Sequence, residues 1–203
     1  MNTFRVITGH HLKLALTIVA LNTGIVHAEE VSPFADHEIS VLSALINHGV
    51  AIDTPIVVIA DYTTGDPATV SADKDTVIAI VEKLGIPRAT VDDWSYRNVT
   101  KQLINQPLDI DMSYQMLSEM ALEELFGDSE PDVGWNKFFT RYSGSPGLLR
   151  VSRVGFDDSL SHALVYIEYQ CGTECGAGRL VHLTRTTEGQ WNVREGAVVW
   201  LTE

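Results

Sequence analysis

The chain contains 203 residues, with 27 acidic and 14 basic side chains, so its formal net charge at pH 7 is −13. A chain this acidic repels phosphate backbones and anionic lipid, which makes nucleic acids and membrane surfaces poor partners. The length suits one domain with a sizeable core, and the sequence contains no internal repeat and no low-complexity tract.

Residues 1–28 have the composition of a secretory signal. Two basic residues precede an apolar run from Leu14 to Val26, and Ala28 stands at a small-residue position before a cleavage point. The run is short for a span of about 30 Å of hydrocarbon, and a helix that stays as an anchor is the alternative. We therefore predict an exported chain, periplasmic or secreted, whose mature form is a single domain over 29–203.

The part of the chain before Leu148 alternates between helical and extended patterns. Apolar residues at helical spacing, bounded by capping residues such as Ser118 and by glycines, predict helices, and short apolar runs predict strands. The polar segment 128–134 is expected to be a hinge. The expected helices are 33–48, 71–84, 90–100, 118–126 and 135–142, and the expected strands are 56–60 and 112–117.

Four polar residues, Asp61, Thr63, Thr64 and Asp66, crowd the loop after the predicted strand 56–60. Carboxylate and hydroxyl groups at the end of a buried strand suit a nucleophile and a magnesium ligand. The loop is partly similar to the D-x-D-x-T motif of haloacid-dehalogenase-like phosphatases, but Thr63 stands at the second aspartate and no lysine with an acidic pair is evident downstream. The alternative is turn chemistry, in which these side chains bond their own backbone.

The last third of the chain alternates with period two, which predicts an antiparallel ribbon. We therefore predict an α+β fold in which N-terminal helices pack on one face of a mainly antiparallel sheet formed by a C-terminal four-strand meander. The expected strands are Leu148–Phe156, His162–Cys171, Arg179–Thr186 and Trp191–Leu201. The apolar face expected to receive the helices contains Val151, Ala163, Val165, Ile167, Tyr169, Val181 and Leu183.

The other face of the ribbon is more polar and contains the candidate binding residues. If the turns set the register as their spacing suggests, Arg150 lies opposite Glu168 and Glu168 lies opposite His182, with Tyr166 beside them. Such a row could bind a ligand, since the acid would tune the histidine and the arginine could hold an anion. The alternative is a solvated face with cross-strand charge pairs, each stabilising the fold by about 0.2–1 kcal/mol.

Cys171 and Cys175 are the only cysteines, and they lie at the tip of the predicted middle hairpin. An even pair in an exported chain predicts a disulfide, and the small loop that it closes would contribute about 2 kcal/mol. The C-x-x-x-C spacing differs from the C-x-x-C of thiol oxidoreductases, although free or redox-active thiols are an alternative. Zinc is another, but it would need two further ligands, and His162 and His182 lie well away from the tip.

Several short motifs fall between Trp135 and Trp200. They are W-x-x-F-F-x-R-Y-x-G-S from Trp135, S-R-V-G-F from Ser152, A-L-V-Y from Ala163, C-G-x-x-C-G-x-G from Cys171 and a late tryptophan. As a block they resemble a family of small exported bacterial proteins of uncharacterised function. The resemblance implies an exported α+β domain with a paired-cysteine hairpin, and it implies no activity. Glu174 stands where an apolar residue is usual in that family, so a different environment of the tip is expected.

No catalytic constellation is evident, so the sequence favours a non-catalytic domain that binds a protein partner or a small ligand. The binding surface would be the polar face of the ribbon or the cysteine hairpin. The alternative is a periplasmic, phosphatase-like hydrolase that uses Asp61 and Asp66 or the row Arg150–Glu168–His182. Thiol–disulfide exchange at the hairpin tip is a third hypothesis. The sequence predicts no cofactor and no metal site.

Overall fold

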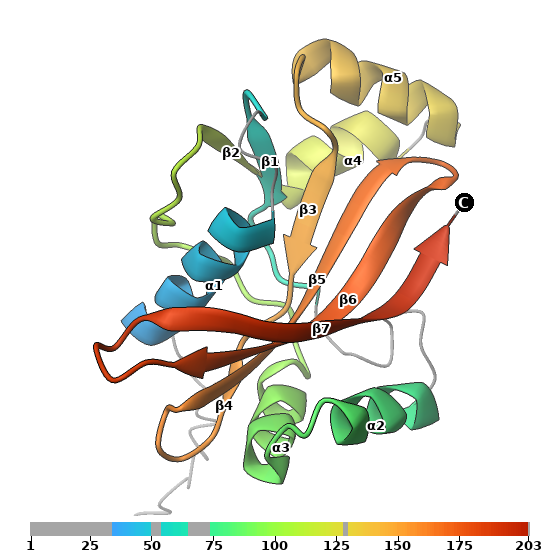
Figure 1. The fold of residues 1–203 in the computed structure, drawn as a ribbon. Coiled ribbons are helices and arrows are strands. Elements are labelled where there is room, and N and C mark those ends of the chain that lie inside the picture. Colours follow the sequence, from blue (N-terminus) through green and yellow to red (C-terminus); the bar gives the residue numbers. More distant parts are fainter. Residues whose placement is uncertain (1–33, 50–53, 65–73, 128–129, 203) are drawn as a thin grey trace, which may run out of the picture. The chain divides into compact units, whose positions relative to one another are not determined.

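Figure 1 shows the fold over the residues that the computed structural model describes, which are 34–49, 54–64, 74–127 and 130–202. The predicted signal segment 1–28 and Asp66 lie outside these ranges. The helices are α1 Asp36–Gly49, α2 Lys74–Lys83, α3 Arg88–Arg97, α4 Glu119–Phe126 and α5 Pro131–Arg141. The strands are β1 Val57–Ala60, β2 Tyr114–Leu117, β3 Leu148–Val151, β4 Gly155–Phe156, β5 His162–Gly172, β6 Cys175–Arg185 and β7 Trp191–Thr202.

The helices and strands predicted before Leu148 are all present, and the ends that fall within the described ranges differ by a few residues; positions 33, 71–73 and 128–129 lie outside those ranges. The main difference is α5, which begins at Pro131 inside the segment predicted to be a hinge. Proline suits the first helical turn because its missing N–H would have no partner there. Among the helices described, none has the length and apolar character needed to cross a membrane.

The seven described strands form one mixed, mostly antiparallel sheet in the order β2-β1-β3-β5-β6-β7, with β4 paired to β5. This arrangement confirms the α+β class. β1 runs parallel to both β2 and β3, whereas β3, β5, β6 and β7 are antiparallel neighbours. The sheet is therefore wider than the predicted C-terminal ribbon. All four residues of β1 are buried, as expected of a parallel strand that is covered on both faces.

One face of the sheet, here called the α1 face, packs against α1. Val165 and Leu183 from the predicted apolar face are fully buried in the same cluster as Leu42 and Ile46 of α1. The spacing of the two α1 residues places them on one side of the helix, which is the side that a sheet can bury. The residues on the α1 face of the strands and on the apolar side of α1 therefore pack in one core.

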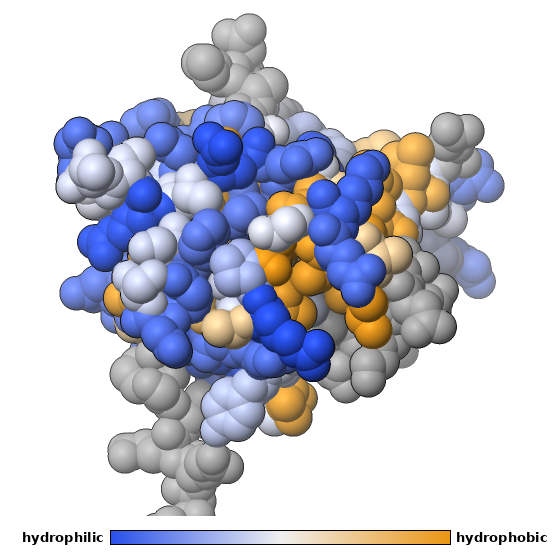
Figure 2. Space-filling view, turned by 60° about the horizontal axis from the view of Figure 1, so that its bottom comes forward, coloured by the Kyte–Doolittle hydropathy of each residue, from blue (hydrophilic) through white to orange (hydrophobic). Residues whose placement is uncertain are grey.

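The opposite face, here called the helix-pair face, is covered by two pairs of helices. α2 and α3 pack near Leu164, Tyr166 and Leu180, while α4 and α5 pack near Val58 and Leu148. The prediction that helices cover one face only was wrong. These five side chains of the helix-pair face are apolar or aromatic, pack against helices, and are each at most 1% exposed. Seen from below Figure 1, the outer surface is mostly hydrophilic, and apolar side chains gather on one side of it (Figure 2).

The predicted strand Leu148–Phe156 is interrupted, and β3 and β4 are its two ends. Side chains of α3 and its C-cap provide partners at the interruption. Trp94 Nε1 donates to Ser152 Oγ at 3.0 Å, and the Asn98 side chain bonds the N–H and the C=O of Arg153 at 2.7 and 3.0 Å. The main chain can therefore leave the sheet at Arg153 without burying unbonded polar groups.

Arg153 also forms a buried ion pair with Glu38 of α1. Its Nε and Nη2 contact the two carboxylate oxygens at 2.8 and 2.6 Å, and the two residues are 5% and 0% exposed. The Arg153 guanidinium lies over the ring of Phe34, and Arg97 lies 3.6 Å from the same carboxylate. No sequence pattern indicated this pair, because its members are 115 positions apart. The pair joins α1 to the interruption between β3 and β4.

The hairpin of β5 and β6 ends in the predicted disulfide, which is confirmed: Cys171 and Cys175 are bonded, with Cα atoms 5.0 Å apart. β6 begins at Cys175, four residues before the predicted start at Arg179, because only Thr173 and Glu174 separate the two strands. A shorter turn changes the register of the whole hairpin. This change decides which side chains meet at the candidate site.

Candidate functional site

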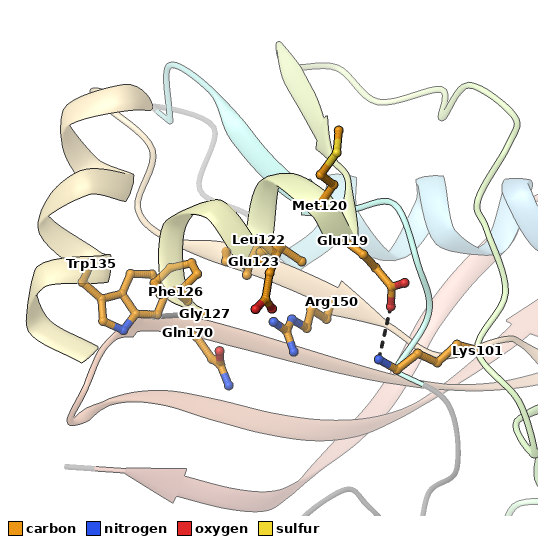
Figure 3. A pocket seen from close by; sticks show the side chains of 11 residues that line it. Lys101, Glu119, Met120, Leu122, Glu123, Phe126, Gly127, Trp135, Arg150 and Gln170 are labelled. Carbon is orange, nitrogen blue, oxygen red and sulfur yellow. Dashed lines mark hydrogen bonds and ion pairs between the residues drawn. The ribbon is translucent and has the colours of Figure 1, made fainter. Parts of the chain in front are cut away.

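A groove lies beside α4 on the helix-pair face. Its larger part has a volume of about 820 Å³, and Figure 3 shows the side chains that line it. An adjoining cavity of about 380 Å³ reaches the residues that follow β1. Both parts are lined by Lys101, Glu119, Leu122 and Arg150, so they form one continuous site, which we call the groove.

Three segments meet at the groove because β1, β2 and β3 run parallel. β1 leads into Thr63 and Thr64, β2 leads through Ser118 into Glu119, and β3 contains Arg150. Ser118 caps α4 by accepting a hydrogen bond from Ala121 N at 3.2 Å, which sets the start of the helix beside the strands. The carboxyl ends of parallel strands are frequent ligand sites because loops and helix starts converge there.

Arg150 lies opposite Glu168 in the register of β3 and β5, as predicted. Arg150 Nη1 lies 3.8 Å from Glu168 Oε1, which is close enough for an ion pair but too long for a hydrogen bond. Arg150 Nε is buried and has no hydrogen-bond partner among the described residues. In Figure 3 the guanidinium extends from β3 into the groove, toward Glu123. Arg150 therefore presents donors that the surrounding protein does not use.

A chain of hydrogen bonds holds Glu168 from the other side. Tyr166 Oη donates to Glu168 Oε2 at 2.9 Å, and Trp200 Nε1 donates to Tyr166 Oη at 2.6 Å. Burial raises the pKa of Tyr166, and the charge of Glu168 raises it further, so the phenol keeps its proton and donates. Gly178 makes room for this chain, because a Cβ at that position would overlap Trp200 Nε1 and Tyr166 Oη. Tyr166, which is 1% exposed, thus holds Glu168 in position.

His182 does not lie in the predicted row. Because the β5–β6 turn is short, Glu168 lies opposite Gly178, and His182 lies opposite Glu195 of β7. The predicted contact between Glu168 and His182 is therefore wrong. Trp200 takes the end of the row instead, since it lies opposite Gly178.

His182 pairs with His162 on the same face of the hairpin. The two rings stack with centroids 5.2 Å apart, and His162 Nδ1 lies 2.9 Å from His182 Nε2. One nitrogen must donate and the other accept, so at least one ring has to be neutral. Burial lowers the pKa of His182, and His162 and Arg194 lower it further, while Glu195 acts in the opposite direction. The folded chain therefore favours a neutral His182.

The stability of the protein is expected to fall as the pH drops below about 6.5. Because the pKa of His182 is lower in the folded chain than in the unfolded chain, the unfolded chain binds the proton first during acidification. Urea unfolding at about pH 7.5 and about pH 5.5 measures the loss. His182→Gln should weaken this pH dependence, whereas the exposed control His48→Gln should keep it. The same dependence in wild type and His182→Gln would contradict the assignment.

Two of the predicted loop residues, Thr63 and Thr64, line one end of the groove, and Asp61 directly follows β1. Thr63 is 1% exposed, and its Oγ1 accepts a hydrogen bond from Gln102 N at 2.9 Å, so it serves the turn. Thr64 Oγ1 and Asp61 Oδ1 are buried and have no hydrogen-bond partner among the described residues. Burial raises the pKa of Asp61, and the charge of Glu119 raises it further.

Lys101 and Glu119 are groove residues that the sequence analysis missed. They form an ion pair at 3.3 Å, and Figure 3 shows it at one end of the groove. Lys101 follows α3 and Glu119 begins α4, so no local spacing connects them. Within the described ranges, no group of three or more His, Cys, Asp or Glu side chains could hold a metal ion. The groove thus combines two cations, each facing an acid, with unbonded polar atoms.

The chain folds as an α+β domain with a charged groove at the ends of parallel strands. Comparison of the chain with protein-family models, with curated proteins and with solved structures found no match in any of the three. A fold alone does not determine an activity, so a function has to come from the chemistry of the groove.

Proposed function

We propose that this chain is an exported, non-catalytic domain that binds a small ligand through an oxyanion, either a carboxylate or a phosphate, in the groove. The observation that carries the proposal is the state of Arg150. Its Nε is buried without a hydrogen-bond partner among the described residues, and its one ion pair, to Glu168, is long. A guanidinium presents its N–H groups as a planar fork that matches two oxygens of a carboxylate or phosphate.

Neighbouring groups would add to the binding of such an oxyanion. Thr64 and Lys101 line the same cavity as Arg150, and Thr64 Oγ1 is a buried hydroxyl without a partner in the described part of the chain. The ammonium of Lys101, whose side chain is 60% exposed, can donate to an anion at Arg150.

The acids of the groove limit the kind of ligand. Glu168 faces Arg150, Glu119 pairs with Lys101, and Glu123 also lines the groove, so its acids outnumber its two cations. A polyphosphate would be repelled by these carboxylates and by the net charge of −13. A ligand with one oxyanion and a neutral or cationic remainder fits better.

Oxyanion binding is expected to raise the melting temperature of the wild-type protein. The probes are inorganic phosphate and acetate, each compared with sodium chloride at equal ionic strength. At ten times Kd the stabilisation would be about 1.4 kcal/mol. Arg150→Gln removes the charged fork and should weaken binding by about 2 kcal/mol, or roughly 30-fold. Calorimetric titration gives the two dissociation constants directly.

Arg88→Gln is the matched control, since it makes the same change at a side chain that is 91% exposed and whose acidic partner in the described part of the chain is Asp92 on its own helix. The control should bind the probes as wild type does. If neither probe stabilises the wild-type protein, or if Arg150→Gln binds as tightly as wild type, the groove is not an oxyanion site.

A phosphatase-like hydrolase is the second candidate, because the raised pKa of Asp61 suits a general acid. A hydrolase built on the row Arg150–Glu168–His182 is not supported, since His182 lies opposite Glu195 and away from Glu168. Release of phosphate from p-nitrophenyl phosphate with Mg²⁺, and its loss in Asp61→Asn, would favour the hydrolase over the binding domain.

Export is part of the proposal. The Cys171–Cys175 disulfide supports it, because disulfides persist in oxidising compartments such as the periplasm and the medium. The predicted signal segment 1–28 and the resemblance to small exported proteins support it as well. A small ligand met outside the cytoplasm is therefore the natural occupant of the groove.

A further inference from the structure

A second cavity lies on the α1 face, on the other side of the sheet from the groove. Its volume is about 370 Å³. Its walls come from the last turns of α1, from β1 and β3, and from the long strands β5, β6 and β7. The side chains that decide its chemistry are Ile167, Tyr169, Arg179, Val181 and Val193.

The interior of this cavity is apolar because α1 covers only part of its face. Val165 and Leu183 are fully buried in the cluster with α1, whereas Ile167, Tyr169 and Val193 are only partly buried in the same cluster. Removing these three side chains from water would be favourable, and a ligand with an apolar body can do so. The volume falls at the small end of the range for small-molecule sites, about 300–1,000 Å³.

Arg179 provides the charged group of the cavity. It lies between Ile167 of β5 and Val198 of β7 in the register of the sheet, and it is exposed. Its guanidinium lies beside Gly196, because a Cβ built on that glycine would be 3.4 Å from Arg179 Nη2. Gly196 lines the cavity too, so the charge sits at the cavity wall.

Arg179 has no acidic partner among the described residues, although the chain contains 27 acidic side chains and 14 basic ones. Among the described arginines, Arg185 and Arg194 also lack an acidic partner, whereas five are paired with acids: Arg88, Arg97, Arg141, Arg150 and Arg153. A cation left available beside an apolar cavity complements an anion with an apolar body.

We propose that this cavity binds a small amphipathic monocarboxylate, with its apolar chain or ring against Ile167, Tyr169 and Val193 and its carboxylate on Arg179. The site is independent of the oxyanion groove, because it lies on the opposite face of the sheet and shares none of its lining residues. The carboxylate supplies orientation, and the apolar contacts supply most of the burial.

Calorimetric titration with octanoate tests the proposal on the full chain. The titrations are made in the Arg150→Gln background, because the groove is itself proposed to bind carboxylates. In that background the chain should bind one octanoate, and adding Arg179→Gln should weaken binding about tenfold, as expected for a lost charge-assisted hydrogen bond. Val193→Glu places a carboxylate in the cavity and should abolish binding. Acetate lacks the apolar body and 1-octanol lacks the charge, so both should bind at least about tenfold more weakly than octanoate.

Two controls separate this cavity from the groove and from general charge effects. Arg150→Gln should keep the octanoate site that Arg179→Gln weakens, and Arg179→Gln should keep the response to inorganic phosphate. Arg185→Gln changes another arginine of β6, outside the lining of the cavity, and should have no effect on octanoate binding. Measured in the Arg150→Gln background, absence of octanoate binding, equal binding after Arg179→Gln or Val193→Glu, or equal affinity for 1-octanol or acetate would each overturn the proposal.

Discussion

Replacing Glu38 with glutamine is expected to lower the free energy of unfolding by about 3–5 kcal/mol, the usual cost of breaking a buried ion pair on one side. Glu38 is fully buried and contacts Arg153 through both carboxylate oxygens, at 2.8 and 2.6 Å. The variant keeps the volume of the side chain but leaves the charge of Arg153 in a site with 5% exposure. Urea unfolding of wild type and variant measures the loss.

The expected loss of stability lies in the upper part of the usual range for single substitutions because the Glu38 carboxylate contacts more than one group. Its Oε2 accepts from Ala35 N at 3.2 Å and lies 3.6 Å from Arg97 Nη1. Arg153 in turn is bonded through its main chain to Asn98. The carboxylate therefore connects α1, α3 and the interruption between β3 and β4.

A double variant separates the energy of the interaction between Glu38 and Arg153 from the effects of each side chain on its other neighbours. Glu38→Leu with Arg153→Leu removes both charges, so its loss of stability should be smaller than the sum of the two single losses by about 1–3 kcal/mol. The surface pair of Arg88 and Asp92, with side chains 91% and 66% exposed, is the control. Arg88→Gln should cost no more than about 0.5 kcal/mol. A loss at Glu38 as small as this would show that the pair is not buried in solution.

Gly155→Ala is expected to destabilise the fold by about 3 kcal/mol, at the upper end of the cost of overpacking a core. A Cβ at Gly155 would overlap the N, Cα and Cβ atoms of Trp94. Two of these atoms belong to the main chain and the third is the Cβ of Trp94, which is 2% exposed. A rotamer change of Trp94 moves none of them, so it cannot make room. The helix α3 would have to move away from β4, and the bond from Trp94 Nε1 to Ser152 Oγ would be strained or lost.

Gly172→Ala is the matched control for the same change in another strand. A Cβ there would have its nearest neighbour at 3.6 Å, at Cys175 Cβ, which is an ordinary contact. Its cost should stay near or below about 0.5–1 kcal/mol. Urea unfolding, with near-ultraviolet circular dichroism as a second probe of tryptophan packing, measures both variants. Equal stability of Gly155→Ala and Gly172→Ala would mean that α3 does not approach β4 as closely as described.

These two sites explain the motif S-R-V-G-F in physical terms. Ser152 bonds Trp94, Arg153 pairs with Glu38, and Gly155 lets α3 approach the sheet. Val154 is fully buried in the cluster with α1. The motif therefore builds the junction of two helices and the sheet, and it is not itself a ligand site.

Most single elements of this protein could be predicted from local patterns. The buried run in β1, the helical spacing of α1 and the pairing of Cys171 with Cys175 depend on residues that are close in the sequence. Period-two alternation correctly predicted the two faces of β5, since Val165 lies on the α1 face and Tyr166 on the helix-pair face. The opposition of Arg150 and Glu168 also followed from alternation and the position of a turn.

Tertiary structure alone decided the register of His182, the helical cover on both faces, and the composition of the two cavities. A turn of two residues between Gly172 and Cys175 was enough to move His182 away from Glu168. The groove brings together Lys101, Glu119 and Arg150 from three separate segments, and no periodicity links them. Local propensity depends on neighbours within a few residues, whereas contacts between distant segments depend on which apolar faces bury each other and which polar groups must then find partners.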